Sequence, residues 1–176
     1  MNDLELARLI SCEVGENFAL AKETAEEYPG YCLVTLRGMC KLICLRVIEA
    51  RNLAIPKAGD LDTLIREVCV RINSDSQTKD ALHKLRSLGN KGAHPEENKL
   101  GNAELSDFAR SALSYAITAL KFAHTQVHPN SPLPAEIVLT AAEFGVKSRC
   151  YRATIQEEVE PALLHNSGSS QVTPTP

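Results

Sequence analysis

"PGYCLVTLRGMCKLICLRVIEARNL", residues 29–53, is the stretch that decides the fold. Pro29 suits the first turn of a helix, where its missing N–H costs nothing. The residues after it are apolar enough for the helix to lie at the centre of a bundle. We expect this helix to end near Asn52, before Pro56.

Helical spacing continues on both sides of this stretch, with apolar residues at steps of three and four. It predicts one long helix over residues 3–28, weakened in its middle by Gly15, and a helix that begins after an N-cap at Asp60. Further helices are predicted over 75–88 and 102–127. Nothing shows the alternation of a sheet, so the chain is predicted to be all-α, with four or five main helices and short C-terminal helices. The predicted divisions are a bundle over 1–130, a C-terminal helical extension over 131–165 and a disordered tail over 166–176.

The composition is that of a globular protein, with 44% hydrophobic and 23% charged residues among 176. No apolar run is long enough to cross a membrane, and the N-terminus lacks the pattern of a secretory signal, so we expect a cytoplasmic protein. The six cysteines form no C-x-x-C pair and are interpreted as reduced core thiols. His124 and His128 share a helical face, but a role at the helix dipole is favoured over a metal site. No metal and no cofactor are predicted.

The net charge of −3 hides an uneven distribution. Residues 29–99 carry twelve basic and eight acidic side chains, whereas both flanking segments are acidic on balance. A basic middle segment could meet a phosphate backbone, or it could pair with its own acidic neighbours in the fold.

One polar motif interrupts the helical pattern: "HKLRSLGNKGAHPEE", residues 83–97. If the helix continues, Arg86, Asn90 and His94 form one line along it. An arginine for phosphate, an amide and a proton-donating histidine suit metal-independent RNA cleavage. In the structural interpretation, two glycines and Pro95 end the helix while Asn90 and His94 cap it. Nucleotide-binding loops, nucleophile elbows and H-E-x-x-H motifs do not occur.

The motif and its context resemble the bacterial domain of unknown function 4145, a branch of the HEPN (higher eukaryote and prokaryote nucleotide-binding) superfamily. The resemblance covers about residues 25–125. It includes a "YP" helix start with an inward arginine at Arg37, followed by an "R-x-x-G-N-x-x-A-H" segment. The positions that fit this segment are Arg86, Gly89, Asn90, Ala93 and His94.

The resemblance implies a helical bundle that pairs as a homodimer and serves a nucleic-acid-directed system. Many HEPN ribonucleases carry Arg-Asn-x-x-x-His, but here Gly89 stands at the arginine position and Arg86 lies one turn earlier. Cys40 replaces a common glutamate, a role that Glu49 could have taken over.

We therefore predict a dimeric HEPN-like module for antiviral defence or restriction, which binds RNA or DNA or assembles with a protein partner, with a non-catalytic role slightly favoured. The predicted nucleic-acid contacts are Arg37, Lys41 and Lys91. One alternative is a metal-independent endoribonuclease using Arg86, Asn90 and His94. Another is a structural scaffold for protein interaction.

Overall fold

The computed structural model describes residues 1–57, 59–133 and 136–138. The chain divides into two units, Met1–Glu143 and Phe144–Pro176, and all described residues belong to the first. They form six helices: α1 (Asp3–Ile10), α2 (Cys12–Thr24), α3 (Pro29–Ala50), α4 (Leu61–Ile72), α5 (Ser76–Ala93) and α6 (Asn102–Val127). The only β pairing among the described residues is an isolated bridge between Asn2 and Val138. The prediction of an all-α bundle is confirmed.

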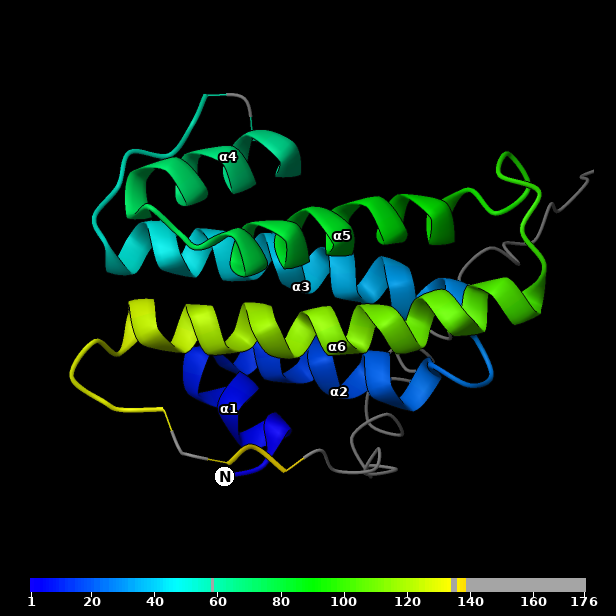
Figure 1. Ribbon diagram of the computed structural model, residues 1–176, viewed down its shortest axis with the longest axis horizontal. Helices are drawn as coiled ribbons and strands as arrows, with labels where there is room; N and C mark the ends of the chain where they lie inside the picture. Colours follow the sequence, from blue (N-terminus) through cyan, green and yellow to red (C-terminus); the bar gives the residue numbers. More distant parts are fainter. Residues whose placement is uncertain (58, 134–135, 139–176) are drawn as a thin grey trace, which may run out of the picture. The chain divides into compact units, whose positions relative to one another are not determined.

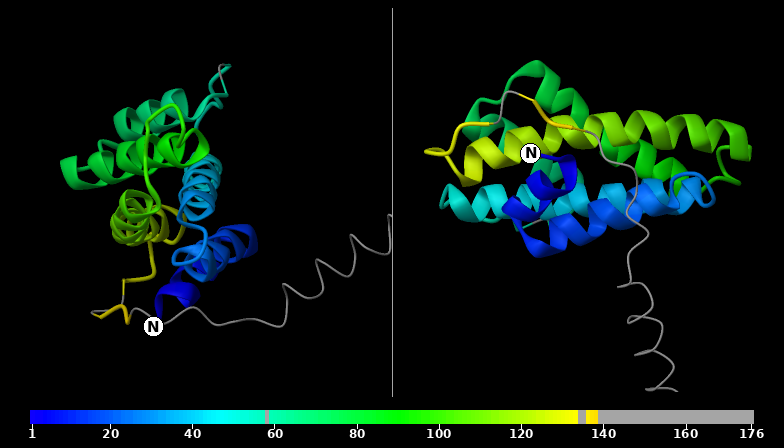
Figure 2. Two further views of the ribbon diagram at one scale, coloured as in Figure 1. Left: turned by 90° about the vertical axis from the view of Figure 1, so that its right-hand side faces the viewer. Right: turned by 90° about the horizontal axis from the view of Figure 1, so that it is seen from below.

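The helices of the first unit lie in three layers (Figure 1). Viewed end-on, α3 and α6 form the middle layer, α4 and α5 cover one side of it, and α1 and α2 cover the other (Figure 2). Helix α3 contacts α2, α4, α5 and α6, while α1 packs on α2 and α6. Helices α3 and α6 run in the same direction, opposite to α2 and α5.

Helix α3 is central because nearly every turn buries an aliphatic or sulfur-bearing side chain. Pro29 occupies its first turn and Arg51 is its C-cap, close to the predicted end. Each fully buried large side chain contributes about 1.5–3 kcal/mol through the removal of apolar surface from water. Its core residues are Leu33, Leu36, Met39, Ile43 and Val47, all 0% exposed.

The prediction of one long helix over residues 3–28 is wrong. Ser11 has an extended backbone (φ −168°, ψ 160°), and its hydroxyl oxygen accepts a hydrogen bond from the Val14 N–H at 3.1 Å. The same residue thus closes α1 and caps α2. Gly15 is a packing position, since a Cβ there would lie 2.6 Å from Arg8 Cγ. The chain folds back at Ser11 and closes α1 onto α2 with no room for a side chain at Gly15.

The prediction that the fourth helix ends at residue 88 is also wrong, because α5 continues through both glycines to Ala93. A Cβ at Gly92 would lie 2.6 Å from Leu33 Cβ and 2.7 Å from the Gly30 carbonyl oxygen. A Cβ at Gly89 would overlap the side chain of Arg37. The glycines therefore let α3 and α5 approach closely, and the helix ends only before Pro95, as proline requires.

Helices α4 and α6 agree with their predicted spans. Asp60 caps α4 by accepting the Thr63 N–H at 3.0 Å. On α6, Phe108 and Tyr115 pack against the core from partly buried positions. The sequence spacing did not single out three further alanines that are buried on α6, Ala109, Ala116 and Ala123.

The chain after α6 returns to the N-terminus. The Asp3 N–H donates to the Val138 carbonyl oxygen at 3.1 Å, and the Val138 N–H donates to the Met1 carbonyl oxygen at 3.2 Å. Of the predicted extension over 131–165, only residues 131–133 and 136–138 are described, and none of these is helical. The remainder of the extension and the predicted tail over 166–176 lie outside the described residues.

The cysteines of the described part are free thiols, as predicted. Burial raises the pKa of the Cys32 thiol to about 12, so this thiol is un-ionised and behaves as a small hydrophobe. Cys12 is exposed, and Cys150 lies outside the described residues. The buried thiols are those of Cys32, Cys40, Cys44 and Cys69. Within the described residues, no helix is both long and apolar enough to cross a membrane.

Candidate functional site

Arg86 lies on α5 but its guanidinium is held by α4. Its Nη2 lies 3.1 Å from Oδ1 of Asp62, a residue in the first turn of α4. Its Nε is buried and has no hydrogen-bond partner among the described residues. Glu49, proposed from the sequence as a substitute acidic residue, pairs instead with Arg46 at 2.8 Å. The alternative that Glu49 takes over the role of the glutamate replaced by Cys40 is therefore wrong.

Asp62 gathers two further basic groups around itself. Its Oδ2 lies 2.5 Å from Arg66 Nη2, and its Oδ1 lies 3.8 Å from His83 Nδ1. Burial lowers the pKa of His83; the Asp62 carboxylate raises it, and the positive charges of Arg86, Lys79 and Arg66 lower it further. Sequence spacing could show that Asp62 and Arg66, and likewise His83 and Arg86, are separated by one helical turn, but not that the two pairs meet across helices.

Asn90 and His94 are exposed at the far end of α5. Asn90 contributes its carbonyl oxygen to the His94 N–H at 3.2 Å, and its side chain makes no hydrogen bond to another described residue. The His94 side chain is 60% exposed, with Nδ1 3.5 Å from Glu97 Oε1. Asn98, rather than Asn90 or the His94 ring, satisfies a carbonyl at the helix end by donating to His94 O at 2.7 Å.

The three other predicted contact residues do not share one environment. Arg37 is exposed rather than inward, and its aliphatic stem passes over Gly89. Lys41 is exposed one turn further along α3, and neither residue forms an ion pair with another described residue. Lys91 is directed toward α6, with its Nζ 4.5 Å from the centre of the Phe108 ring. The inward position expected for Arg37 is thus corrected, because Gly89 leaves space only for its stem.

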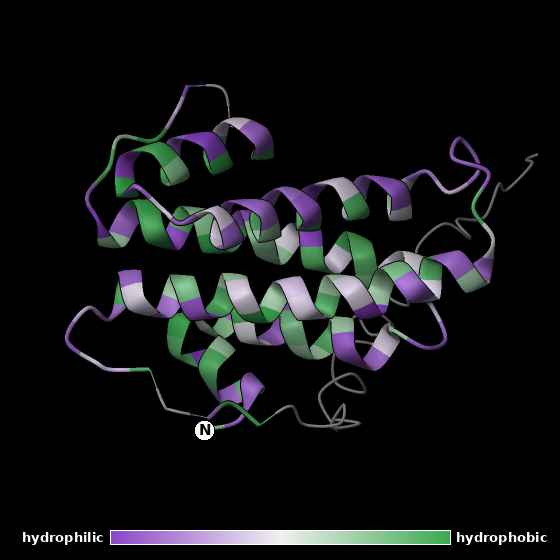
Figure 3. Ribbon diagram, viewed as in Figure 1, coloured by the Kyte–Doolittle hydropathy of each residue, from purple (hydrophilic) through white to green (hydrophobic). Residues whose placement is uncertain are grey.

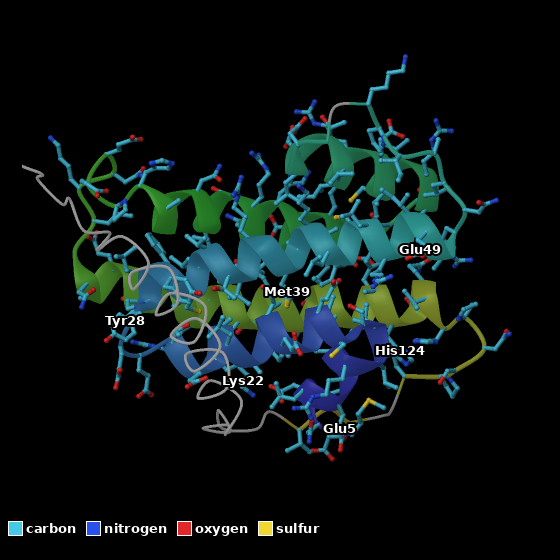
Figure 4. The ribbon with its side chains drawn as sticks, turned by 180° about the vertical axis from the view of Figure 1, so that it is seen from behind. Glu5, Lys22, Tyr28, Met39, Glu49 and His124 are labelled. Atoms are coloured by element: carbon cyan, nitrogen blue, oxygen red, sulfur yellow. The ribbon has the colours of Figure 1, made fainter. Side chains whose placement is uncertain are left out.

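The predicted site therefore divides into two parts. Arg86 contacts Asp62 on α4, whereas Arg37 and Lys41 on α3 and Asn90 on α5 are exposed to solvent, with the stem of Arg37 lying over Gly89 of α5. We call the second group the α3–α5 face. Seen from behind, α3 passes between α5 and α2 (Figure 4), and the outward side of α5 and the loop after it are hydrophilic (Figure 3).

A catalytic triad within one protomer is not assembled. Arg86 and His94 are separated by about 12 Å along the helix axis, from a rise of 1.5 Å per residue. Two surface hollows of about 520 and 420 Å³ lie elsewhere in the described part, one beside α6 and one beside the loop after α3. Neither is lined by a predicted site residue.

The histidine pair at the end of α6 serves packing within the fold. His124 is 1% exposed, its Nδ1 is buried without a partner among the described residues, and its ring centre lies 5.4 Å from that of His128. His128 Nε2 lies 2.8 Å from the Leu9 carbonyl oxygen on α1. No cluster of three metal-ligating side chains occurs in the part of the chain that the structure describes.

The described residues form an all-helical bundle that exposes Arg37 and Lys41 on α3 and Asn90 on α5. No known family model, curated protein or solved structure matches the chain. The resemblance to the domain of unknown function 4145 therefore remains a prediction made from the motif.

Proposed function

We propose that the chain is a non-catalytic, HEPN-like binding module of a cytoplasmic, nucleic-acid-directed bacterial system such as antiviral defence or restriction. In this proposal the module acts as a homodimer, and its α3–α5 face contacts the phosphate backbone of RNA or DNA. The observation that carries it is the exposure of Arg37 and Lys41 on consecutive turns of α3 without an acidic partner among the described residues.

The geometry of the face suits a backbone contact. Two cations about 6 Å apart along the helix axis can meet neighbouring phosphates of a single strand. Asn90 offers an amide with no hydrogen bond to another described side chain, and such an amide can bind a phosphate or sugar oxygen. Gly89 lets the stem of Arg37 lie flat between the helices, which positions its guanidinium at the border of α3 and α5.

The experiment is a salt titration of RNA binding followed by fluorescence anisotropy. Each phosphate contact to single-stranded RNA contributes about 0.7 to the slope of log affinity against log salt. The double variant Arg37→Gln, Lys41→Gln should lower this slope by about 1.4. A charge-matched control, Lys57→Gln with Lys121→Gln, removes two exposed lysines elsewhere and should leave the slope unchanged. An equal loss in both variants, or no binding by the wild-type chain, would overturn the proposal.

Ribonuclease activity is a second candidate because Asn90 and His94 are both accessible and one turn apart. In that case His94 would give a proton to the leaving oxygen, and the arginine would have to come from a second protomer, since Arg86 is held by Asp62. His94→Ala should abolish cleavage in EDTA. Because the ring is 60% exposed, the same change should alter the free energy of unfolding by less than about 0.5 kcal/mol. Cleavage that survives the substitution rules this candidate out.

A further inference from the structure

The cluster around Asp62 has more positive than negative charge. Arg66 and Arg86 contact the carboxylate of Asp62 directly. The positive charge of Lys79 also acts here, because it lowers the pKa of His83. With His83 neutral, these groups carry a net charge of about +2. Two helices, α4 and α5, supply them, so the fold brings together cations that are far apart in the sequence.

Asp62 does not use the full binding capacity of the cations. Arg86 Nε is buried and has no hydrogen-bond partner among the described residues, so one donor of the guanidinium is unsatisfied beside the cluster. Arg66 and His83 keep part of their surface in solvent, with side-chain exposures of 72% and 29%. The cluster is therefore open to an anion from outside while one of its donors lacks an acceptor.

We propose that the junction of α4 and α5 binds a phosphate monoester through Arg66, His83 and Arg86. We call these three residues and Asp62 the Asp62 cluster. A dianion matches the net charge of about +2 that the cluster and Lys79 carry together when His83 is neutral, and its three terminal oxygens can accept from two guanidinium groups and an imidazole N–H. An internal phosphodiester carries a single negative charge and matches it less well. The site goes beyond the proposed function and does not depend on it, because none of its residues belongs to the α3–α5 face.

Binding of a dianion should be coupled to protonation of His83. The charged groups that act on its ring are Asp62 and Arg66 from α4, and Lys79 and Arg86 from α5. Burial and the three cations lower the pKa of His83. A bound dianion offsets the charge of the cations, so it raises the pKa of His83 again. His83 then takes a proton from solvent as the anion binds, and its titration midpoint moves to higher pH.

The first experiment follows the histidine rings by NMR during pH titrations in methyl phosphate and in chloride at equal ionic strength. The resonance that disappears in His83→Gln identifies the ring. Its midpoint should move to higher pH in methyl phosphate only, while that of His94, which lies outside the cluster, should not move. Equal midpoints of His83 in the two salts would overturn the proposal.

The second experiment separates the sources of the phosphate and the two sites. Arg86→Gln should weaken methyl phosphate binding at least about tenfold. Arg66→Gln, at a more exposed position, should weaken binding in the same direction and guards against a folding defect of the first variant. Lys121→Gln should have no effect.

A comparison of two RNAs identifies the source of the phosphate. If an RNA with a 5′-phosphate binds more tightly than the same RNA with a 5′-hydroxyl, and Arg66→Gln loses this preference, the site is assigned to a nucleic-acid end. If the protein binds methyl phosphate but binds the two RNAs with equal affinity, the site is assigned to a small phosphate ester. If the protein does not bind methyl phosphate, the proposed site is contradicted, even if the α3–α5 face binds RNA.

Discussion

Substitution of Gly92 by alanine tests the close approach of α3 and α5. Alanine is favoured over glycine in a helix by up to about 1 kcal/mol, so propensity alone predicts a more stable protein. The added methyl would lie 2.6 Å from Leu33 Cβ and 2.7 Å from the Gly30 carbonyl oxygen. Favourable contacts between such atoms need about 3.5–4.0 Å, and neither obstacle can rotate away, since one is a backbone atom and the other is fixed to the backbone.

Overpacking of this kind typically costs about 1–3 kcal/mol. After the propensity gain, we expect Gly92→Ala to lower the free energy of unfolding by about 1–2 kcal/mol, with a lower melting temperature. Gly89→Ala should act in the same direction, because its methyl would overlap Arg37. The assay is equilibrium unfolding in urea, followed by far-UV circular dichroism and checked for an unchanged m-value.

Gly38 supplies the matched control. It lies within α3, is exposed, and a Cβ there would meet nothing nearer than Asn17 Oδ1 at 3.9 Å. Gly38→Ala should therefore raise the free energy of unfolding by about 0.5–1 kcal/mol. Opposite signs at Gly92 and Gly38 are the expected result. A Gly92→Ala protein as stable as Gly38→Ala would refute the close crossing.

Two further predictions concern buried ionisable groups. Burial, and then the charge of His128, lower the pKa of His124 below the unfolded value of about 6.5. The unfolded chain then takes up the proton first, so the contribution of His124 to stability is complete above pH 6.5 and falls as the pH is lowered below it. His124→Asn should flatten that slope in denaturant titrations. The Lys22–Asp3 ion pair measures 2.6 Å, with side-chain exposures of 10% and 2%, so Lys22→Met alone should cost about 3–5 kcal/mol of stability. Adding Asp3→Asn should recover part of this loss, and additive losses in the double-mutant cycle would contradict a coupled pair.

The helices could largely be predicted because they depend on local patterns. The apolar run after Pro29 and the Asp60 cap act within a few residues, and both gave helix positions close to the observed ones. The two errors have different causes. Ser11 was one polar residue within a continuous apolar spacing, and the turn there depends on its hydroxyl capping α2. Glycine usually weakens or ends a helix, and only the presence of α3 explains why α5 continues through Gly89 and Gly92.

The site was less predictable than the fold because spacing along one helix cannot identify the partner on another. Arg86, Asn90 and His94 do form a line along α5, but Asp62 belongs to a different helix and forms an ion pair with the arginine. His83 is just one turn from Arg86, yet its significance depends on the same carboxylate. No pattern in "HKLRSLGNKGAHPEE" indicates that its first and fourth residues approach Asp62 on α4.

This division limits how the protein can use the motif. A ribonuclease site needs its cation, amide and imidazole around one phosphate, within hydrogen-bonding distance of the reacting oxygens. Within one protomer, Arg86 is bound to Asp62 and lies two helical turns from His94, so the same phosphate cannot contact both without breaking the Arg86–Asp62 pair. Arg37 is exposed, its stem lies over Gly89, and it has no ion pair with another described residue to break. The glycine at position 89 therefore has a structural consequence: it admits the stem of Arg37, so that a basic side chain from α3 lies over α5 at this point.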